Sequence, residues 1–140
     1  MSTTENKALV RRAIDEIWNA HNLGAVDDLY AADFVNHDPL APEVTGLDAF
    51  KAWISGVFDS FPDIQVTVDD MVAEGDKVAK VYTLTATHTG ELLGVPPTGK
   101  PVTMAGISIY RIADGEIAEM TWSYNMLGTM MQVGAIPAPG

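Results

Sequence analysis

The stretch VTMAGISIYRIADGEIAEMTWSYNM, residues 102–126, decides the fold. Its pattern repeats every two residues on both sides of Asp114-Gly115, a dipeptide typical of a tight hairpin turn. The stretch IQVTVDDMVAEGDKVAKVYTLTATHTG, residues 64–90, has the same period and contains a turn signal at EGD. The sequence therefore predicts about four long strands in succession, joined as an antiparallel meander.

Two helices are predicted before these strands. Ser2 and Glu5 have the spacing of a capping box, and an apolar stripe at helical intervals follows and ends at Gly24, which we expect to cap the helix. A second helical stripe begins at Leu47 and ends before Pro62. Between the helices, a short helical piece over residues 25–31 leads into an irregular segment that holds His37 and Asp38.

Helices that precede a run of strands are typical of the α+β class. We expect residues 1–140 to form a single domain, since this length supports one hydrophobic core. The economical arrangement is a strongly curved, mostly antiparallel sheet whose open side is closed by the N-terminal helices. Such a cone-shaped barrel would enclose an apolar pocket of the kind that small molecules occupy.

The composition narrows the choice of partner. Eight Lys and Arg residues stand against 19 Asp and Glu residues, a net charge of −11, which would repel a nucleic acid. No apolar run is long enough to span a membrane, and the polar N-terminus does not resemble a secretory signal, so we expect no membrane partner and a cytoplasmic location. Without cysteine, HxH or HExxH, we also expect no metal site.

Histidines are the first candidates for proton transfer, because an unperturbed imidazole titrates near pH ~6.5. His37 lies in the sequence NHDP and His88 closes a strand in THTG, and both are expected to border the pocket. His21 follows the first helix, where a structural or surface role is expected. A lone histidine is more often a satisfied structural residue than a catalyst, so both readings stay open for His37 and His88.

Five pieces of the chain carry a resemblance: FVNHDP, FPDIQVTVDDMVAEGDKVA, THTGELLGVPPTGKPV, ISIYRIADGEIAEM and NMLGTMMQVG. In this order and spacing, from about residue 33 to residue 134, the chain resembles the SnoaL-like polyketide cyclase (ester cyclase) family of the NTF2-like superfamily. The resemblance implies the cone-shaped α+β barrel and a pocket without cofactor or metal. It also implies an intramolecular aldol condensation that closes a ring in an aromatic polyketide ester.

The family pattern has an aspartate as general acid/base three residues before a glycine, and this chain has Asn125 there. An amide cannot take up a proton near neutral pH. Losing a positioned acid/base group typically costs ~10²–10⁴ in rate. The family mechanism therefore does not transfer to this sequence unchanged.

Three hypotheses follow. In the first, the chain is a cyclase-type enzyme in which His37 or His88 is the base, while Asn125 and Tyr124 stabilise the enolate oxygen. In the second, the pocket binds a hydrophobic small molecule without turning it over. In the third, it performs another NTF2-like reaction, as a lyase, an isomerase or an epoxide hydrolase. The residues expected to contact the substrate are Trp53, Phe58, Met104, Tyr110, Trp122 and Tyr124.

The apolar C-terminal tail contains Met126, Met130 and Met131. It is expected either to close the mouth of the barrel or to contribute to a dimer surface. Because sheets of this superfamily often pack back to back, the resemblance also implies a homodimer.

Overall fold

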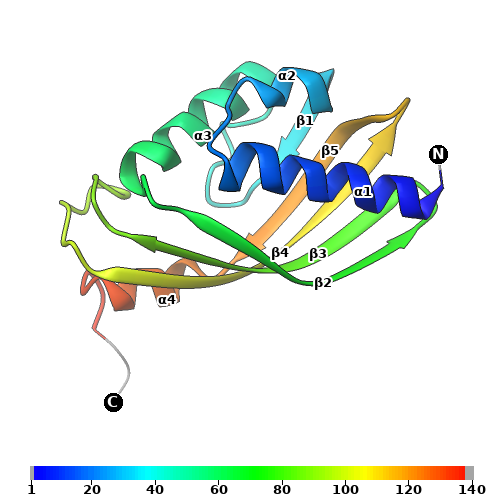
Figure 1. The fold of residues 1–140 in the computed structure, drawn as a ribbon. Coiled ribbons are helices and arrows are strands. Elements are labelled where there is room, and N and C mark those ends of the chain that lie inside the picture. Colours follow the sequence, from blue (N-terminus) through cyan, green and yellow to red (C-terminus); the bar gives the residue numbers. More distant parts are fainter. Residues whose placement is uncertain (1, 138–140) are drawn as a thin grey trace.

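The computed structural model describes residues 2–137, which form a curved five-stranded sheet with the helices of the first 60 residues on one face (Figure 1). The helical elements are α1 (Thr3–Ala13), the π-helical turn η1 (Ile14–Asn19), α2 (Ala25–Leu29), α3 (Leu47–Ser60) and α4 (Met126–Gln132). The strands are β1 (Tyr30–His37), β2 (Gln65–Glu74), β3 (Lys77–Thr87), β4 (Pro101–Ala113) and β5 (Glu116–Tyr124). This confirms the predicted α+β class and the four long strands.

The sheet has the order β1-β5-β4-β3-β2. Strands β2 to β5 form the predicted antiparallel meander, with left-handed backbone at Gly75, Asp114 and Gly115 in its two tight turns. Strand β1 pairs with β5 in parallel, with His37 opposite Thr121. The segment around His37 was predicted to be irregular. It is instead the end of an edge strand, because its backbone pairs with β5.

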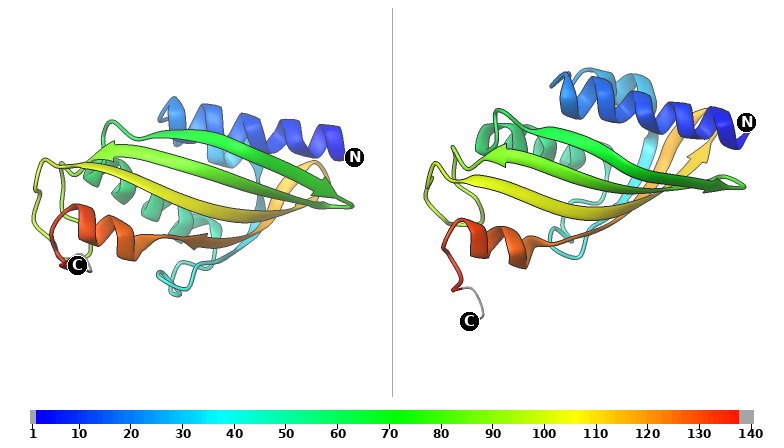
Figure 2. Two further views of the ribbon diagram at one scale, coloured as in Figure 1. Left: turned by 90° about the horizontal axis from the view of Figure 1, so that it is seen from below. Right: turned by 60° about the horizontal axis from the view of Figure 1, so that its bottom comes forward.

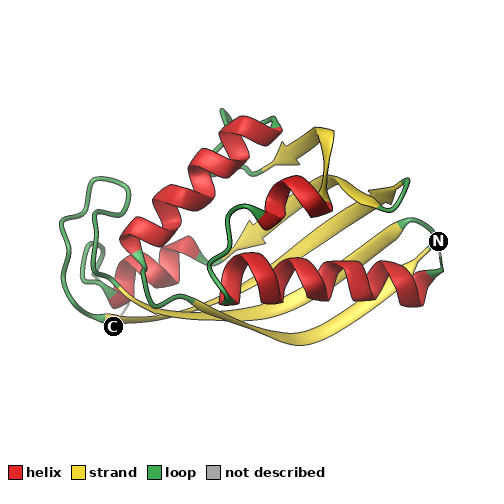
Figure 3. Ribbon diagram, turned by 45° about the horizontal axis from the view of Figure 1, so that its top comes forward, coloured by secondary structure: helices red, strands yellow, loops and turns green. Residues whose placement is uncertain are grey.

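The sheet is strongly curved but open, since β1 and β2 are separate edges (Figure 3). As expected, the sheet does not close on itself, and its concave face is covered by α1, α2 and α3. The pairing register shifts between Val68 and Asp70, where β2 has one extra residue, and between Arg111 and Ile112 of β4, where β5 has one extra residue. Such irregularities increase local twist and bend a sheet around its covering helices.

Helix α1 begins as the sequence predicts, with reciprocal hydrogen bonds between Ser2 and Glu5. It then continues into η1, and the chain leaves the helical conformation at His21, whose φ is 55°. Gly24 has a φ of −62° and stands at the start of α2, so its predicted role as the C-terminal cap of the first helix is wrong.

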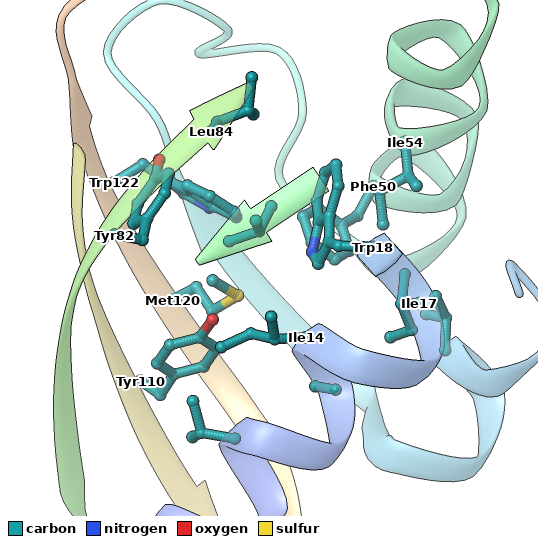
Figure 4. Close-up of a cluster of buried hydrophobic side chains, with 14 of the residues drawn as sticks. Ile14, Ile17, Trp18, Phe50, Ile54, Tyr82, Leu84, Tyr110, Met120 and Trp122 are labelled. Carbon is teal, nitrogen blue, oxygen red and sulfur yellow. The ribbon is translucent and has the colours of Figure 1, made fainter. Parts of the chain in front are cut away.

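The core lies between the concave face of the sheet and the helices (Figure 4). Trp18 meets Trp53 and Trp122 edge to face, at centroid distances of 6.0 and 6.3 Å. Such pairs add about 0.5–1.5 kcal/mol beyond the burial of their area. The apolar stripe predicted for the first helix supplies Val10, Ile14 and Ile17 to this core.

The loop of residues 88–100, which joins β3 to β4, lies at the same end of the sheet as α4, which follows β5 (Figure 2). The loop is tied to the end of α3, because the backbone N–H groups of Thr89 and Gly90 both donate to the carbonyl of Ser60. Within residues 2–137, no helix is long and apolar enough to cross a membrane.

Candidate active site

A largely apolar cavity of about 190 Å³ lies under the helices, against the concave face of the sheet. Its walls come from η1, α3, the inner faces of β2 to β5, the segment after β1, the 88–100 loop and α4. The lining residues that the argument below uses are Trp18, Trp53, Lys80, Tyr82, Trp122 and Tyr124. The expected pocket is therefore present, and it contains polar groups that the pattern of the sequence did not single out.

Strand pairing arranges the polar side chains in two rows across the sheet. Lys80 lies opposite Ser108, which lies opposite Trp122, and Tyr82 lies opposite Gly106, which lies opposite Tyr124. Since alternate residues of a strand share a face, both rows point toward the helices. Neighbouring strands thus bring the amine and both phenols to one wall.

Asp38 and Tyr124 form a partly buried hydrogen bond at this wall. The Tyr124 hydroxyl donates to Asp38 Oδ2 at 2.8 Å, and the backbone N–H of Leu40 donates to Asp38 Oδ1 at 2.9 Å. Asp38 is only 4% exposed. Burial, together with the hydrogen bond to the carboxylate, raises the pKa of Tyr124 above its ordinary value. A buried carboxylate therefore stands directly behind a phenol that lines the cavity.

Asn36, two residues earlier, fixes the position of this segment. Its Oδ1 accepts a hydrogen bond of 2.7 Å from Trp122 Nε1, and its Nδ2 donates to the carbonyl of Val44 at 3.1 Å. The amide joins the last strand to the loop that follows β1, and all three groups are buried. Because both ends of the Asn36 amide are occupied, the amide has a structural role beside Asp38.

Lys80 is 1% exposed and lies on the same wall. Its Nζ donates to the Tyr110 hydroxyl at 2.8 Å and lies 4.3 Å from the centroid of the Tyr82 ring. The rings of Tyr110 and Trp122 are 5.2 and 5.5 Å away. Burial lowers the pKa of Lys80 to about 7, because the protonated form loses its hydration.

His37 faces away from the cavity. Its side chain is 51% exposed, and Nε2 lies 2.6 Å from Glu119 Oε2. Glu119 also accepts a hydrogen bond of 3.0 Å from Arg111, and these two bonds lower the pKa of Glu119. The three side chains form a surface cluster on the outer side of β1, β5 and β4.

His88 is fully buried at the start of the 88–100 loop, outside the cavity wall. Its Nδ1 accepts from the Thr98 backbone N–H at 3.3 Å and lies 3.0 Å from Thr98 Oγ1. Its backbone bonds to Lys100 and Gly99. In the part of the chain that the structure describes, Nε2 has no hydrogen-bond partner. These contacts hold together the two ends of the loop.

Asn125 is exposed and caps helix α4. Its Oδ1 accepts a hydrogen bond of 2.9 Å from the backbone N–H of Gly128. The residue therefore performs the task typical of an N-cap amide. Asn125 does not contribute to the cavity wall, although its neighbours Tyr124 and Met126 do.

Four of the six predicted substrate contacts line the cavity: Trp53, Met104, Trp122 and Tyr124. Phe58 stacks against His21 at 4.8 Å instead, and Tyr110 lies behind Lys80. Binding by these residues stays a prediction, as do the catalytic roles of His37, His88 and Asn125.

Sequence reasoning missed Lys80, Tyr82 and Asp38. Lys80 and Tyr82 fall in the alternating set that faces the core, between Val78 and Leu84, and this set was a usable signal. A lysine there interrupts an otherwise apolar inner face, and buried lysines are uncommon without a functional or pairing reason. For Asp38 the sequence offered only its position beside His37.

Comparisons with known proteins find relatives over most of the chain. The family model described as SnoaL-like polyketide cyclase matches residues 8–133. Aklanonic acid methyl ester cyclase DauD from Streptomyces sp. (strain C5) is 31% identical over 135 residues, which cover 90% of this chain and 80% of that protein.

Solved structures show the same fold. AclR from Streptomyces galilaeus, for which a hydroxylase role has been proposed, aligns with a TM-score of 0.88 at 30% identity, over 99% of this chain and 87% of that chain. A protein from Jannaschia sp. CCS1, assigned to the SnoaL-like polyketide cyclases, aligns with a TM-score of 0.85 at 29% identity, over 96% and 95% of the two chains. The NTF2-like architecture implied by the resemblance is therefore confirmed.

Proposed function

Because this chain belongs to the SnoaL-like polyketide cyclase family, we propose that it closes a ring in a hydrophobic, polyketide-like ester. The proposed reaction is an intramolecular aldol addition that needs acid/base groups of the protein but no cofactor. The substrate class is suggested by DauD, a relative that acts on the methyl ester of aklanonic acid.

The observation that carries this proposal is the Asp38–Tyr124 pair at the wall of an apolar, aromatic cavity. An aldol addition needs a group that removes a proton from carbon and later returns one to the alkoxide. Asp38 is a carboxylate that can hold this proton, and Tyr124 connects it to the cavity. The surrounding aromatic walls suit a planar polyketide and exclude water.

The proton would pass through Tyr124 in a concerted step. As Tyr124 Oη takes the proton from the carbon acid, the hydroxyl gives its own proton to Asp38 Oδ2. A free tyrosinate is avoided, which matters because burial raises the pKa of Tyr124. After the carbon–carbon bond forms, the reverse transfer protonates the new alkoxide, and both residues return to their starting states.

The test follows hydrogen exchange at the acidic carbon. The protein is incubated with an aromatic polyketide methyl ester in D₂O, exchange is measured by mass spectrometry, and the isomeric cyclised product is separated by chromatography. We expect Asp38→Asn and Tyr124→Phe to lower both rates by about 10²–10⁴. The competing assignment, a histidine base, predicts the larger loss for His37→Ala or His88→Gln. Absence of exchange and cyclisation with every such ester would reject the proposed reaction.

A second function, binding without turnover, is favoured by the cavity itself. Its wall is mainly apolar, and three tryptophans lie close to it: Trp18, Trp53 and Trp122. A bound aromatic molecule would quench their fluorescence. Quenching that saturates while no hydrogen exchange occurs would support a binding protein rather than an enzyme. Another lyase or isomerase reaction would instead give a product that is not the cyclised isomer.

We also propose that the protein forms a homodimer through the convex face of the sheet. That face exposes Val72, Val81, Ile107 and Ile109, which are 39–59% exposed. Large apolar side chains gathered on one sheet face often mark an interaction surface. Light scattering at micromolar concentration tests this: a dimer mass that falls to the monomer mass in Ile107→Lys supports it, and a monomer mass for the unaltered protein rejects it.

A further inference from the structure

Lys80 is an amine in the wall of the cavity that the proposed proton transfer does not use. A buried lysine is usually paired with a carboxylate, because an uncompensated ammonium is costly inside a protein. Within residues 2–137, no carboxylate forms an ion pair with Lys80. Its hydrogen-bond partner is the neutral Tyr110 hydroxyl, at 2.8 Å. The surroundings therefore tolerate an amine without a counter-ion.

Two opposing effects decide the charge of this amine. Loss of hydration disfavours the ammonium form and lowers the pKa of Lys80 to about 7. The faces of the Tyr82, Tyr110 and Trp122 rings favour the ammonium form through cation–π attraction. These rings are held in place by their packing, so Lys80 can be accommodated either as the neutral amine or as the ammonium ion. A substantial fraction of Lys80 is therefore the neutral amine at or slightly above neutral pH.

We propose that Lys80 forms an imine with a ketone or aldehyde group of a hydrophobic aromatic ligand in this cavity. Lys80 lines a largely apolar cavity, and an uncharged lysine in such a place is a nucleophile. This activity rests on Lys80 and on the cavity, and does not depend on whether Asp38 and Tyr124 close a ring.

The chemistry is self-contained. The Nζ lone pair attacks the carbonyl carbon, the carbonyl π electrons move to oxygen, and a proton moves from nitrogen to that oxygen. The resulting carbinolamine loses its hydroxyl group as water, after a second proton from nitrogen has reached it. One carbon–nitrogen double bond replaces the carbon–oxygen double bond, one water is released, and nothing is oxidised or reduced. Hydrolysis reverses the step, and the apolar wall slows it by keeping water away.

Such an imine would also increase the acidity of the neighbouring C–H bonds. Protonated, it withdraws electrons more strongly than the parent carbonyl, so that the adjacent carbon loses a proton more readily. The amine lies on the same wall as Tyr82, whose ring centroid is 4.3 Å from Nζ. If the cavity does perform carbon-acid chemistry, Lys80 would activate the ketone whose α-proton is removed.

The experiment traps the imine by reduction. The protein is incubated with 6-methoxy-2-naphthaldehyde and sodium cyanoborohydride at pH 7.5, and the adduct is located by intact-mass and peptide mass spectrometry. The corresponding alcohol is the control ligand. At pH 7 about half of an amine of pKa ~7 is free, against about 1 in 2,500 for an ordinary lysine. We expect one adduct per chain, at Lys80, formed at least about tenfold faster than at Lys77, an exposed lysine of the same strand.

The modified residue is identified by peptide mass spectrometry of the wild-type protein, so the test does not depend on the folding of a variant. Lys80→Met should lose the adduct and Lys77→Met should keep it, with circular dichroism as the check of folding. The labelling rate should level off above about pH 7, whereas that of N-acetyl-lysine continues to rise toward pH ~10. Labelling spread evenly over the surface lysines, or a Lys80 peptide without adduct, would overturn the proposal.

Discussion

The Tyr82 ring lies directly over Gly106 on the neighbouring strand. A Cβ atom at position 106 would be 2.5 Å from both Cζ and Oη of Tyr82, well inside van der Waals contact. The missing side chain of Gly106 is therefore what allows Tyr82 to lie flat in the cavity wall and to cover the amine of Lys80.

Replacement of this glycine should disturb the wall. We expect Gly106→Ala to lower the free energy of unfolding by about 1–3 kcal/mol, because the packed tyrosine must leave its position. Urea denaturation measures the loss, and tryptophan quenching by an aromatic ligand should show weaker binding. Gly56→Ala is the matched control, since Gly56 is exposed in the middle of α3 with nothing within 4 Å of its added Cβ. It should stabilise the protein by about 1 kcal/mol. Equal stability of Gly106→Ala and wild type would show that Tyr82 is not held by this contact.

The buried amine should make stability depend on pH. The pKa of Lys80 falls from 10.5 in the unfolded chain to about 7 in the folded one, so between these values the unfolded chain holds more protons. The free energy of unfolding should therefore rise with pH between about pH 7 and 10.

Lys80→Met removes this dependence. We expect the variant to be about 2–3 kcal/mol more stable than wild type near pH 7, with the difference shrinking toward pH 10, since the aromatic rings offset part of the cost of burying the charge. Urea denaturation at pH 7, 8.5 and 10 measures the trend. A variant that is less stable than wild type at pH 7 would mean that the ammonium form is the one that the rings hold.

The His37–Glu119 pair should matter little for stability. Both side chains are at least one-third exposed, and such pairs contribute about 0.2–1 kcal/mol. We expect His37→Ala to lower the free energy of unfolding by less than about 1 kcal/mol and to leave any hydrogen exchange on a polyketide ester unchanged. The pKa of Glu119 is lowered, so its contribution is present above pH 4.5 and is lost as the pH falls through the lower folded-state value. A large loss of hydrogen exchange on the ester in His37→Ala would instead indicate that His37 takes part in the proton transfer.

The sequence predicted the elements whose signals are local. The capping box of Ser2, the stripe of α3 and the turns of the meander are decided by neighbours a few residues apart. Strand β1 was not predicted, because its pairing partner, β5, is about 85 residues away along the chain. Its burial also breaks the alternation that would mark a strand.

The site was predicted in part, for a similar reason. Tyr124 and Trp122 could be placed near a pocket because they end the last strand. The inward direction of Lys80 was contained in the alternation of β3, but the depth of its burial depends on the helix packed above it. Asp38 became a candidate only when the parallel pairing of β1 with β5 brought it to Tyr124. Contacts of this kind depend on the assembled fold rather than on spacing.

Asn125 is the position at which the resemblance led us to expect an aspartate. In the chain described here its side chain caps α4 through the N–H of Gly128 and lies outside the cavity wall. Aspartate at this position would keep the capping bond, since either oxygen accepts it, and a negative charge suits a helix N-terminus. We expect Asn125→Asp to change the free energy of unfolding by less than about 1 kcal/mol, while Asn125→Ala should lower it by about 1 kcal/mol. Neither should change the rate of cyclisation or hydrogen exchange, because the proton acceptor proposed for this chain is Asp38. A gain of cyclisation in Asn125→Asp that persists in Asp38→Asn would show that residue 125 reaches the substrate, and that the carboxylate of the family pattern has been lost from this chain.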